Sequence, residues 1–201
     1  MGNYLKLKSS GRFEAYDDTT QYHLSWDDLK SPATTINPPG AASDPDRETT
    51  TGLLLFGAAS TELVYLLLQM PHAWKEGSAI SPHVHWTKTT SAAGDVAWNL
   101  KYQILPIGKV GPGSWTDAGI ASSPVAGTPD NDTAWEHLLT SWTDIDMNDG
   151  VSDYSLSTCI LFEVSRVGGN AADTYGADAR LLEFDVHYQI DSLGSEEEFS
   201  K

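Results

Sequence analysis

The sequence is poor in positive charge. Its 201 residues contain 12 Lys and Arg against 28 Asp and Glu, which gives a formal net charge of −16. Sequence-independent nucleic-acid binding needs cations that displace phosphate counterions, and docking on an anionic membrane leaflet needs them too. We therefore expect no nucleic-acid partner and no membrane partner. An acidic surface instead suits a protein partner with a basic face.

Cysteine and long hydrophobic runs are also scarce. Cys159 is the only cysteine, so no intramolecular disulfide can form and stability must come from a hydrophobic core. The longest apolar runs, such as Leu53–Phe56 and Leu66–Leu68, are far too short to span a bilayer. Hydrophobic residues still make up 40% of the chain, enough for one well-buried core.

Alternation of hydrophobic and polar residues predicts the fold. Asp95–Ile104, Tyr154–Val164 and Leu182–Ile190 place hydrophobic residues at every second position, as half-buried strands do. In the last run we expect Leu182, Phe184, Val186, Tyr188 and Ile190 to face the core, and Glu183, Asp185, His187 and Gln189 to face outward. Many strands without alternating helices predict an all-β fold, namely an antiparallel jelly-roll-like sandwich or barrel with an extended N-terminal arm and long loops.

Composition divides the chain into three segments. Residues 1–52 form an N-terminal segment in which the prolines of Ser31–Thr51 remove backbone donors, so this stretch is expected to be an extended arm or a long loop. Residues 53–194 form the predicted β-sandwich, and residues 195–201 form an acidic tail. Ser123–Asp130 is expected to be a loop, and Asp132–Leu139 a short helical turn.

Two histidines on one predicted strand suggest a metal site. In Pro82-His-Val-His-Trp86, His83 and His85 share one strand face, so both imidazoles can reach one ion. Gly77 and the two histidines also resemble the opening half of the cupin metal motif, but the Glu that this motif requires next is missing. His187 is the expected third ligand. The alternative is that His83 and His85 are hydrogen-bonded on a strand face or at a subunit contact.

No complete catalytic constellation is recognisable. The chain has no Gly-x-Ser-x-Gly elbow, P-loop or dinucleotide fingerprint. Glu163, Glu183 and Asp185 lie on polar strand faces and could form a glycosidase pair, but surface solubility explains them as well. We therefore expect a protein that is not an enzyme, and we assign no catalytic residue and no cofactor.

Tryptophans offer a further alternative. Trp115, Trp135 and Trp142 are near predicted loops and could form a platform on which sugars stack. Trp86 and Trp98 fall on strand faces that we expect to point inward, where core packing is the better interpretation. A carbohydrate-binding module is therefore kept as an alternative function.

An ordered set of motifs resembles a known group of proteins. The motifs are Trp26-Asp-Asp-Leu-Lys-Ser-Pro32, Ile36-Asn-Pro-Pro-Gly-Ala41, Leu54-Leu-Phe56, Gln69-Met-Pro-His-Ala-Trp-Lys-Glu-Gly77 and Pro82-His-Val-His-Trp86. In this order they resemble a family of uncharacterised structural proteins, about 200 residues long, encoded among the virion genes of tailed bacteriophages and prophages. The resemblance rests on these motifs between Trp26 and Trp86.

The resemblance implies a role in the phage particle. Small jelly-roll proteins of this setting decorate or cement capsids, often as trimers at local threefold axes. It therefore implies a capsid decoration protein located in the virion, a homo-oligomer whose partners are the major capsid protein or other virion proteins. A tail-associated role and a cupin-like metal-binding protein or enzyme remain the alternatives.

Overall fold

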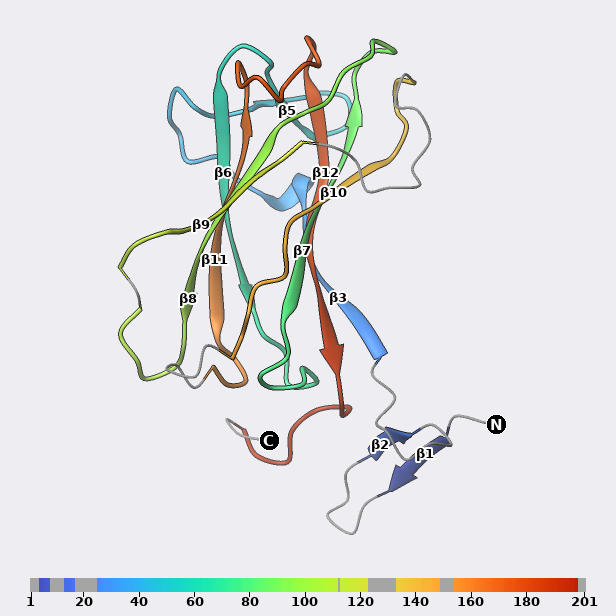
Figure 1. Cartoon of the computed structure of the whole chain (residues 1–201), viewed down its shortest axis with the longest axis vertical. Helices are drawn as coiled ribbons and strands as arrows, with labels where there is room; N and C mark the ends of the chain where they lie inside the picture. The colour runs from blue at the N-terminus through green and yellow to red at the C-terminus, as the bar shows by residue number, and fades with distance from the viewer. Residues whose placement is uncertain are drawn as a thin grey trace.

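The chain is built from β-strands (Figure 1). The computed structural model describes residues 4–7, 13–16, 25–111, 113–122, 133–148 and 154–198. Within these ranges one short 3-10 helix, η1 (Ala33–Thr35), interrupts the strands. No helical segment of the described residues is long and hydrophobic enough to cross a membrane. Strands β1 (Tyr4–Leu7) and β2 (Phe13–Tyr16) pair with each other.

Two antiparallel sheets form the body of the protein. The four-stranded sheet has the order β6 (Thr61–Gln69), β11 (Cys159–Val167), β8 (Trp98–Leu105) and β9 (Thr116–Ala121). The six-stranded sheet has the order β10 (Leu138–Ser141), β7 (Ile80–Lys88), β12 (Ala179–Ile190), β5 (Leu54–Phe56) and β4 (Asp46–Arg47). Its sixth strand, β3 (Ser25–Pro32), pairs with the second part of β12, from Glu183 to Ile190, whereas the short β5 pairs with Ala179–Leu181 at the start of β12.

The strand order is that of a jelly roll. Strand β5 pairs with β12, β6 with β11, β7 with β10, and β8 with β9, all antiparallel. Pairs nested in this way correspond to one long hairpin rolled up so that successive strands pass between two sheets. The expected all-β, jelly-roll-like sandwich is therefore confirmed.

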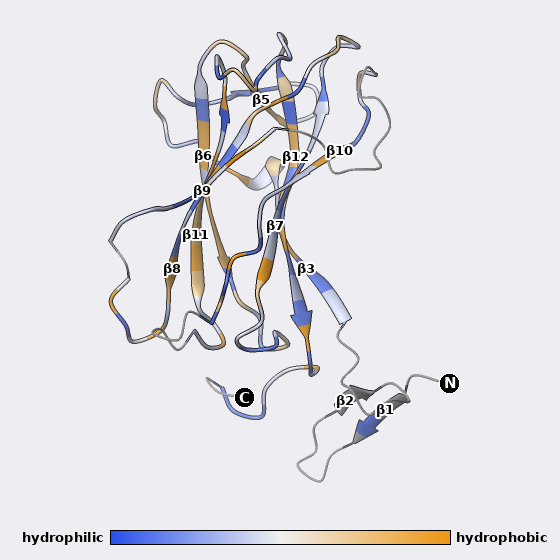
Figure 2. Cartoon of the chain, viewed as in Figure 1, coloured by the Kyte–Doolittle hydropathy of each residue, from blue (hydrophilic) through white to orange (hydrophobic). Residues whose placement is uncertain are grey.

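The core lies between the two sheets, as the alternation predicts. Trp86 and Trp98 are fully buried, with ring centroids 6.2 Å apart, so they pack the core. Figure 2 shows hydrophobic colouring along β6 and β11 and hydrophilic colouring on β3. The small thiol of Cys159, at the start of β11, is half-buried.

Three local expectations are wrong. The strand expected from Tyr154 begins only at Cys159 and continues to Val167. Asp132 lies outside the described residues, and Leu138–Ser141 is strand β10 rather than part of a helical turn. In β12 the register shifts between Leu181 and Glu183, so Leu181 is fully buried and Leu182 only half-buried. Such a bulge re-aims side chains, which simple alternation does not anticipate.

The Pro-rich stretch packs against the sandwich. Ala33 is fully buried and Ile36 is 4% exposed, and both belong to the core. Arg47 in β4 donates to the carbonyl oxygens of Ala33, Ile36 and Gly52, which lie outside the sheets. Strands β3 and β4, which precede residue 52, pair with β12 and β5, which follow it. The boundary expected at residue 52 therefore divides the six-stranded sheet. At the other end, the hydroxyl of Ser195, in the expected tail, lies 2.6 Å from Nδ1 of His72.

Candidate functional site

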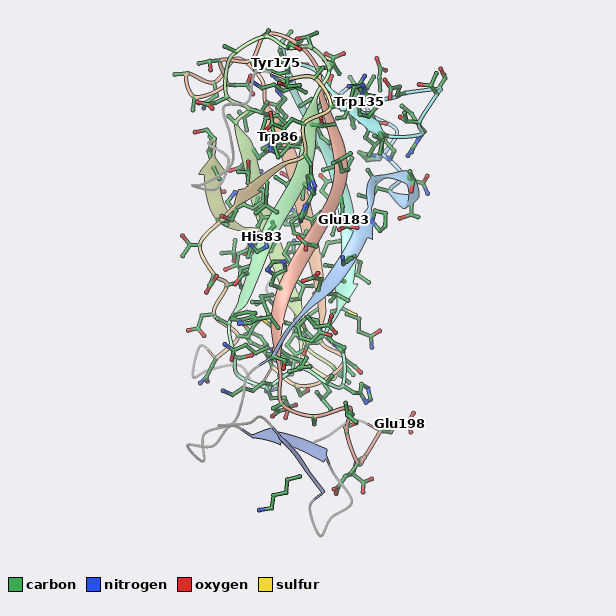
Figure 3. All side chains as sticks on the ribbon, turned by 90° about the vertical axis from the view of Figure 1, so that its right-hand side faces the viewer. His83, Trp86, Trp135, Tyr175, Glu183 and Glu198 are labelled. Atoms are coloured by element: carbon green, nitrogen blue, oxygen red, sulfur yellow. The ribbon has the colours of Figure 1, made fainter. Side chains whose placement is uncertain are left out.

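The predicted histidines lie on the outer face of the six-stranded sheet. Val84 on β7 and Val186 on β12 point into the core, so residues at odd positions on these strands point the other way. Figure 3 looks onto this face, with His83 on β7 and Glu183 on the neighbouring β12. The local sequence thus selects the face on which the histidines lie.

Strand register brings the polar residues of this face together. Asp185 on β12 is directly opposite His83, and Glu183 is opposite His85. His187 is opposite Asp28 on the other neighbour, β3. Directly opposed side chains have Cβ atoms about 5 Å apart, so each of these pairs can interact.

Asp185 is the centre of the cluster. Its side chain is buried although it is on the outer face, because imidazoles surround it. Oδ1 lies 3.2 Å from Nε2 of His85 and 3.8 Å from Nδ1 of His83. Oδ2 lies 3.3 Å from Nε2 of His187, which is also 3.2 Å from Oδ1 of Asp28. The expectation that Asp185 serves solubility on a polar surface is therefore wrong.

These contacts are close, but three of the atoms lack aligned hydrogen bonds. Within the described residues, Asp185 Oδ1, His83 Nδ1 and His85 Nε2 are buried and have no hydrogen-bond partner of proper geometry. Buried polar atoms are nearly always satisfied, because an unpaired one costs about 1–3 kcal/mol. Three such atoms facing one another indicate a place where a bound cation or water would supply the missing contacts.

The electrostatics favour a neutral imidazole at His83. Burial lowers the pKa of His83, and the adjacent His187 lowers it further, while Asp185 acts in the opposite direction. The rings of His83 and His187 have centroids 4.2 Å apart. A neutral imidazole keeps a lone pair, which is the form that coordinates metal.

A fourth histidine, which the sequence did not single out, joins the cluster from the loop before β10. Nε2 of His137 lies 2.7 Å from Nδ1 of His85. Burial lowers the pKa of His137, and His85 lowers it further. Leu139 pairs with His85 in the β10–β7 ladder, so His137, two residues earlier, lies diagonally across from His85. No sequence spacing connects residues so far apart in the chain.

An open cavity of about 350 Å³ adjoins the cluster. It is lined by Trp26, Ser81, His83, Ser141, Trp142, Asp144 and His187. The hydroxyl of Ser81 donates to Asp144 at 2.6 Å, and the indole of Trp26 is 53% exposed. An exposed aromatic face beside hydroxyl and carboxylate groups can bind a small polar ligand.

Among the residues that the structure describes, the possible metal ligands form two groups that share Asp185. His83, Asp185 and His187 offer ligand atoms within 4.8 Å of one another, and so do His85, Glu183 and Asp185. The structure therefore joins two of the three predicted ligands, His83 and His187, through an aspartate. His85 belongs to the second group.

The other sequence candidates do not converge. Trp115 stacks on Tyr65 at 5.8 Å, whereas the guanidinium of Arg180 lies 3.8 Å over the ring of Trp135. Trp142 is 8% exposed, and its indole donates to the backbone of the β9 strand. The three tryptophans thus have separate partners and do not form one platform. Glu163, a further candidate, is buried and accepts a 2.8 Å hydrogen bond from the ammonium group of Lys101.

Comparisons with known proteins give only weak likenesses. No protein-family model and no curated protein sequence matches the chain. Among solved structures, CBM35 from Cellvibrio japonicus Abf62 aligns with a TM-score of 0.36 and 11% identity, over 81% of this chain and 92% of that one. A carbohydrate-binding module specific for non-crystalline cellulose, CBM28, aligns with a TM-score of 0.32 and 11% identity, over 96% of this chain and 82% of that one. Likenesses at this level do not establish a shared ligand.

Proposed function

We propose that this chain is a structural protein of a tailed-phage particle. In this proposal it is a non-enzymatic capsid decoration protein that forms a homo-oligomer, with a trimer as the expected form. Its partners are the major capsid protein or other virion proteins. The ordered motifs between Trp26 and Trp86 carry the proposal. They fall mainly on β3, β5 and β7, which all pair with β12. Three of the five motifs thus lie on one sheet, whereas Ile36–Ala41 and most of Gln69–Gly77 lie on connecting segments.

An apolar surface on the other sheet supports an oligomer. Leu67 on β6 is 56% exposed and lies opposite Leu161, and Ile120 on β9 is 46% exposed. Tyr65, two residues before Leu67 on the same face of β6, stacks on Trp115, whereas Ile120 lies on the opposite edge strand. The solvent-facing side of an antiparallel sheet is normally polar, so exposed apolar residues here suit a subunit contact.

Charge supports a protein partner with a basic surface. With a net charge of −16, copies of the chain repel one another at long range, so the contact between them must be apolar. The same charge attracts a basic partner and accelerates encounter at low salt. Binding to particles should therefore weaken as salt rises, whereas the homo-oligomer should persist.

Two measurements test the proposal. Light scattering after size-exclusion chromatography should show an oligomer that Leu67→Asp converts to monomer. Val110→Asp is the matched control, because Val110 is 98% exposed but lies in the loop between β8 and β9 rather than on a strand face. Co-sedimentation with phage particles lacking the chain should show saturable binding. A monomeric chain that does not bind particles would contradict the proposal.

The cavity beside the histidine cluster favours carbohydrate binding as a second candidate function. Trp26 supplies an exposed aromatic face, and Ser81 and Asp144 supply hydrogen-bonding groups. On a glycan array, this candidate predicts binding that Trp26→Ala abolishes and Trp135→Ala retains, since both indoles are 53% exposed but only Trp26 lines the cavity. Absence of glycan binding would remove this candidate and leave the structural role untouched.

A further inference from the structure

The buried aspartate between histidines is the feature from which a ligand can be inferred. Asp185 is 1% exposed, and its Oδ1 has no aligned hydrogen bond from the described residues. A folded chain does not bury a carboxylate among imidazoles without some compensating interaction. Either protons shared with the histidines or a cation can supply it.

We propose that His83, Asp185 and His187 bind one divalent transition-metal ion, with zinc as the test ion. Their ligand atoms lie within 4.8 Å of one another, so small side-chain rotations bring all three to bonds of about 2.0–2.2 Å. Two imidazoles and one carboxylate suit zinc and its neighbours in the first transition row, whereas magnesium and calcium prefer oxygen alone.

The cavity distinguishes this group from the second one. His83 and His187 line the cavity of about 350 Å³, so a metal between them keeps a coordination position open to water or to a small ligand. The second group contains one imidazole and two carboxylates, and its His85 is already paired with His137 at 2.7 Å. We assign His85 a positioning role, since its ring lies against the carboxylate, with Nε2 3.2 Å from Oδ1 of Asp185, and restricts how that side chain can turn.

Nearby charges add to the attraction. Asp28 lies 3.2 Å from His187, and Asp144 lines the same cavity. Lys30 is the nearby cation, but it is half-exposed and pairs with Asp28 and Glu183 at 3.4 and 3.9 Å. The surroundings of the three ligands are therefore net negative, which favours a divalent cation.

Zinc titration of the full-length, metal-depleted chain tests the site. Calorimetry should give about one equivalent, and affinity should fall about 100-fold or more in His83→Ala, His187→Ala and Asp185→Asn. His85→Ala should lose about 10-fold, as expected for a residue that orients a ligand. His72→Ala is the matched control and should bind as the parent does, because His72 bonds to Ser157 and Ser195 instead.

Folding of each variant is checked by its thermal melt without metal, and a variant that does not fold is replaced by the corresponding glutamine (His83→Gln, His187→Gln). Substitution with cobalt should give a visible absorption band in the parent chain and none in Asp185→Asn. Absence of zinc binding would overturn the proposal. So would a loss of binding that follows His85→Ala and Glu183→Gln but not His83→Ala and His187→Ala. The result is independent of the proposed virion role, which is tested by oligomeric state and particle binding.

Discussion

Two buried carboxylates in this chain have opposite surroundings. Asp173 receives two hydrogen bonds, of 2.9 and 2.8 Å, from the fully buried Arg166 and a third from the backbone of Ala97. Arg166 uses its remaining donors on carbonyl oxygens of the surrounding chain. Asp185 is equally buried but has imidazoles at 3.2–3.8 Å and an unmatched oxygen.

The difference separates a structural cluster from a candidate binding cluster. Around Arg166 every guanidinium donor has a partner within the protein, so nothing remains for a ligand. Around Asp185 the donors and acceptors do not match, and the group adjoins a cavity. Burial alone therefore does not identify a site, whereas several buried, unmatched polar atoms that face one another beside a cavity support one.

The same substitution at both aspartates tests this comparison most directly. Asp173→Asn should lower the free energy of unfolding by about 3–5 kcal/mol, because it leaves the buried guanidinium of Arg166 without its counter-charge. Urea denaturation at pH 8 measures the change. A loss below about 1 kcal/mol would show that the Arg166 cluster does not anchor the sandwich.

The hydrogen bond between the buried Tyr188 and the exposed Asp27 should have an intermediate effect. The hydroxyl of Tyr188 donates to Asp27 Oδ2 at 3.1 Å, so Tyr188→Phe should cost about 1–2 kcal/mol near neutral pH. Burial and the Asp27 carboxylate raise the pKa of Tyr188 to about 12.

The raised pKa also fixes the sign of the pH dependence. The folded chain holds this proton more tightly than the unfolded chain, whose tyrosine pKa is about 10. The contribution is therefore complete below pH 10 and lost as pH rises from about 10 to about 12. Tyr188→Phe should remove this part of the alkaline stability loss, and an unchanged alkaline profile would contradict the assignment.

The smallest change is expected at Asp185. In metal-free chain at pH 8, Asp185→Asn should alter the free energy of unfolding by less than about 1 kcal/mol, because the carboxylate it removes is poorly matched there. The parent chain should gain thermal stability on adding zinc, and the variant should not. A large loss of unfolding free energy in the metal-free variant would contradict this prediction and show that Asp185, like Asp173, is a structural residue.

Much of the fold could be predicted because strand alternation is local. The period of two correctly placed Trp86 and Trp98 in the core, and His83, His85 and His187 on one outer face. The bulge after Leu181, the docking of Ala33 into the core and the role of Asp185 could not be predicted. They depend on which strands lie side by side, and one sequence does not specify that.

Charge and alternation are properties of neighbouring residues, so the sequence was enough to predict an acidic all-β chain in which His83, His85 and His187 point away from the core. Only the tertiary structure decided that β7 and β3 flank β12 on either side. That arrangement turns an aspartate expected to be solvated into a buried carboxylate between imidazoles, since residues about 100 positions apart become cross-strand neighbours. Packing, rather than residue type, therefore makes Asp185 the centre of the candidate site.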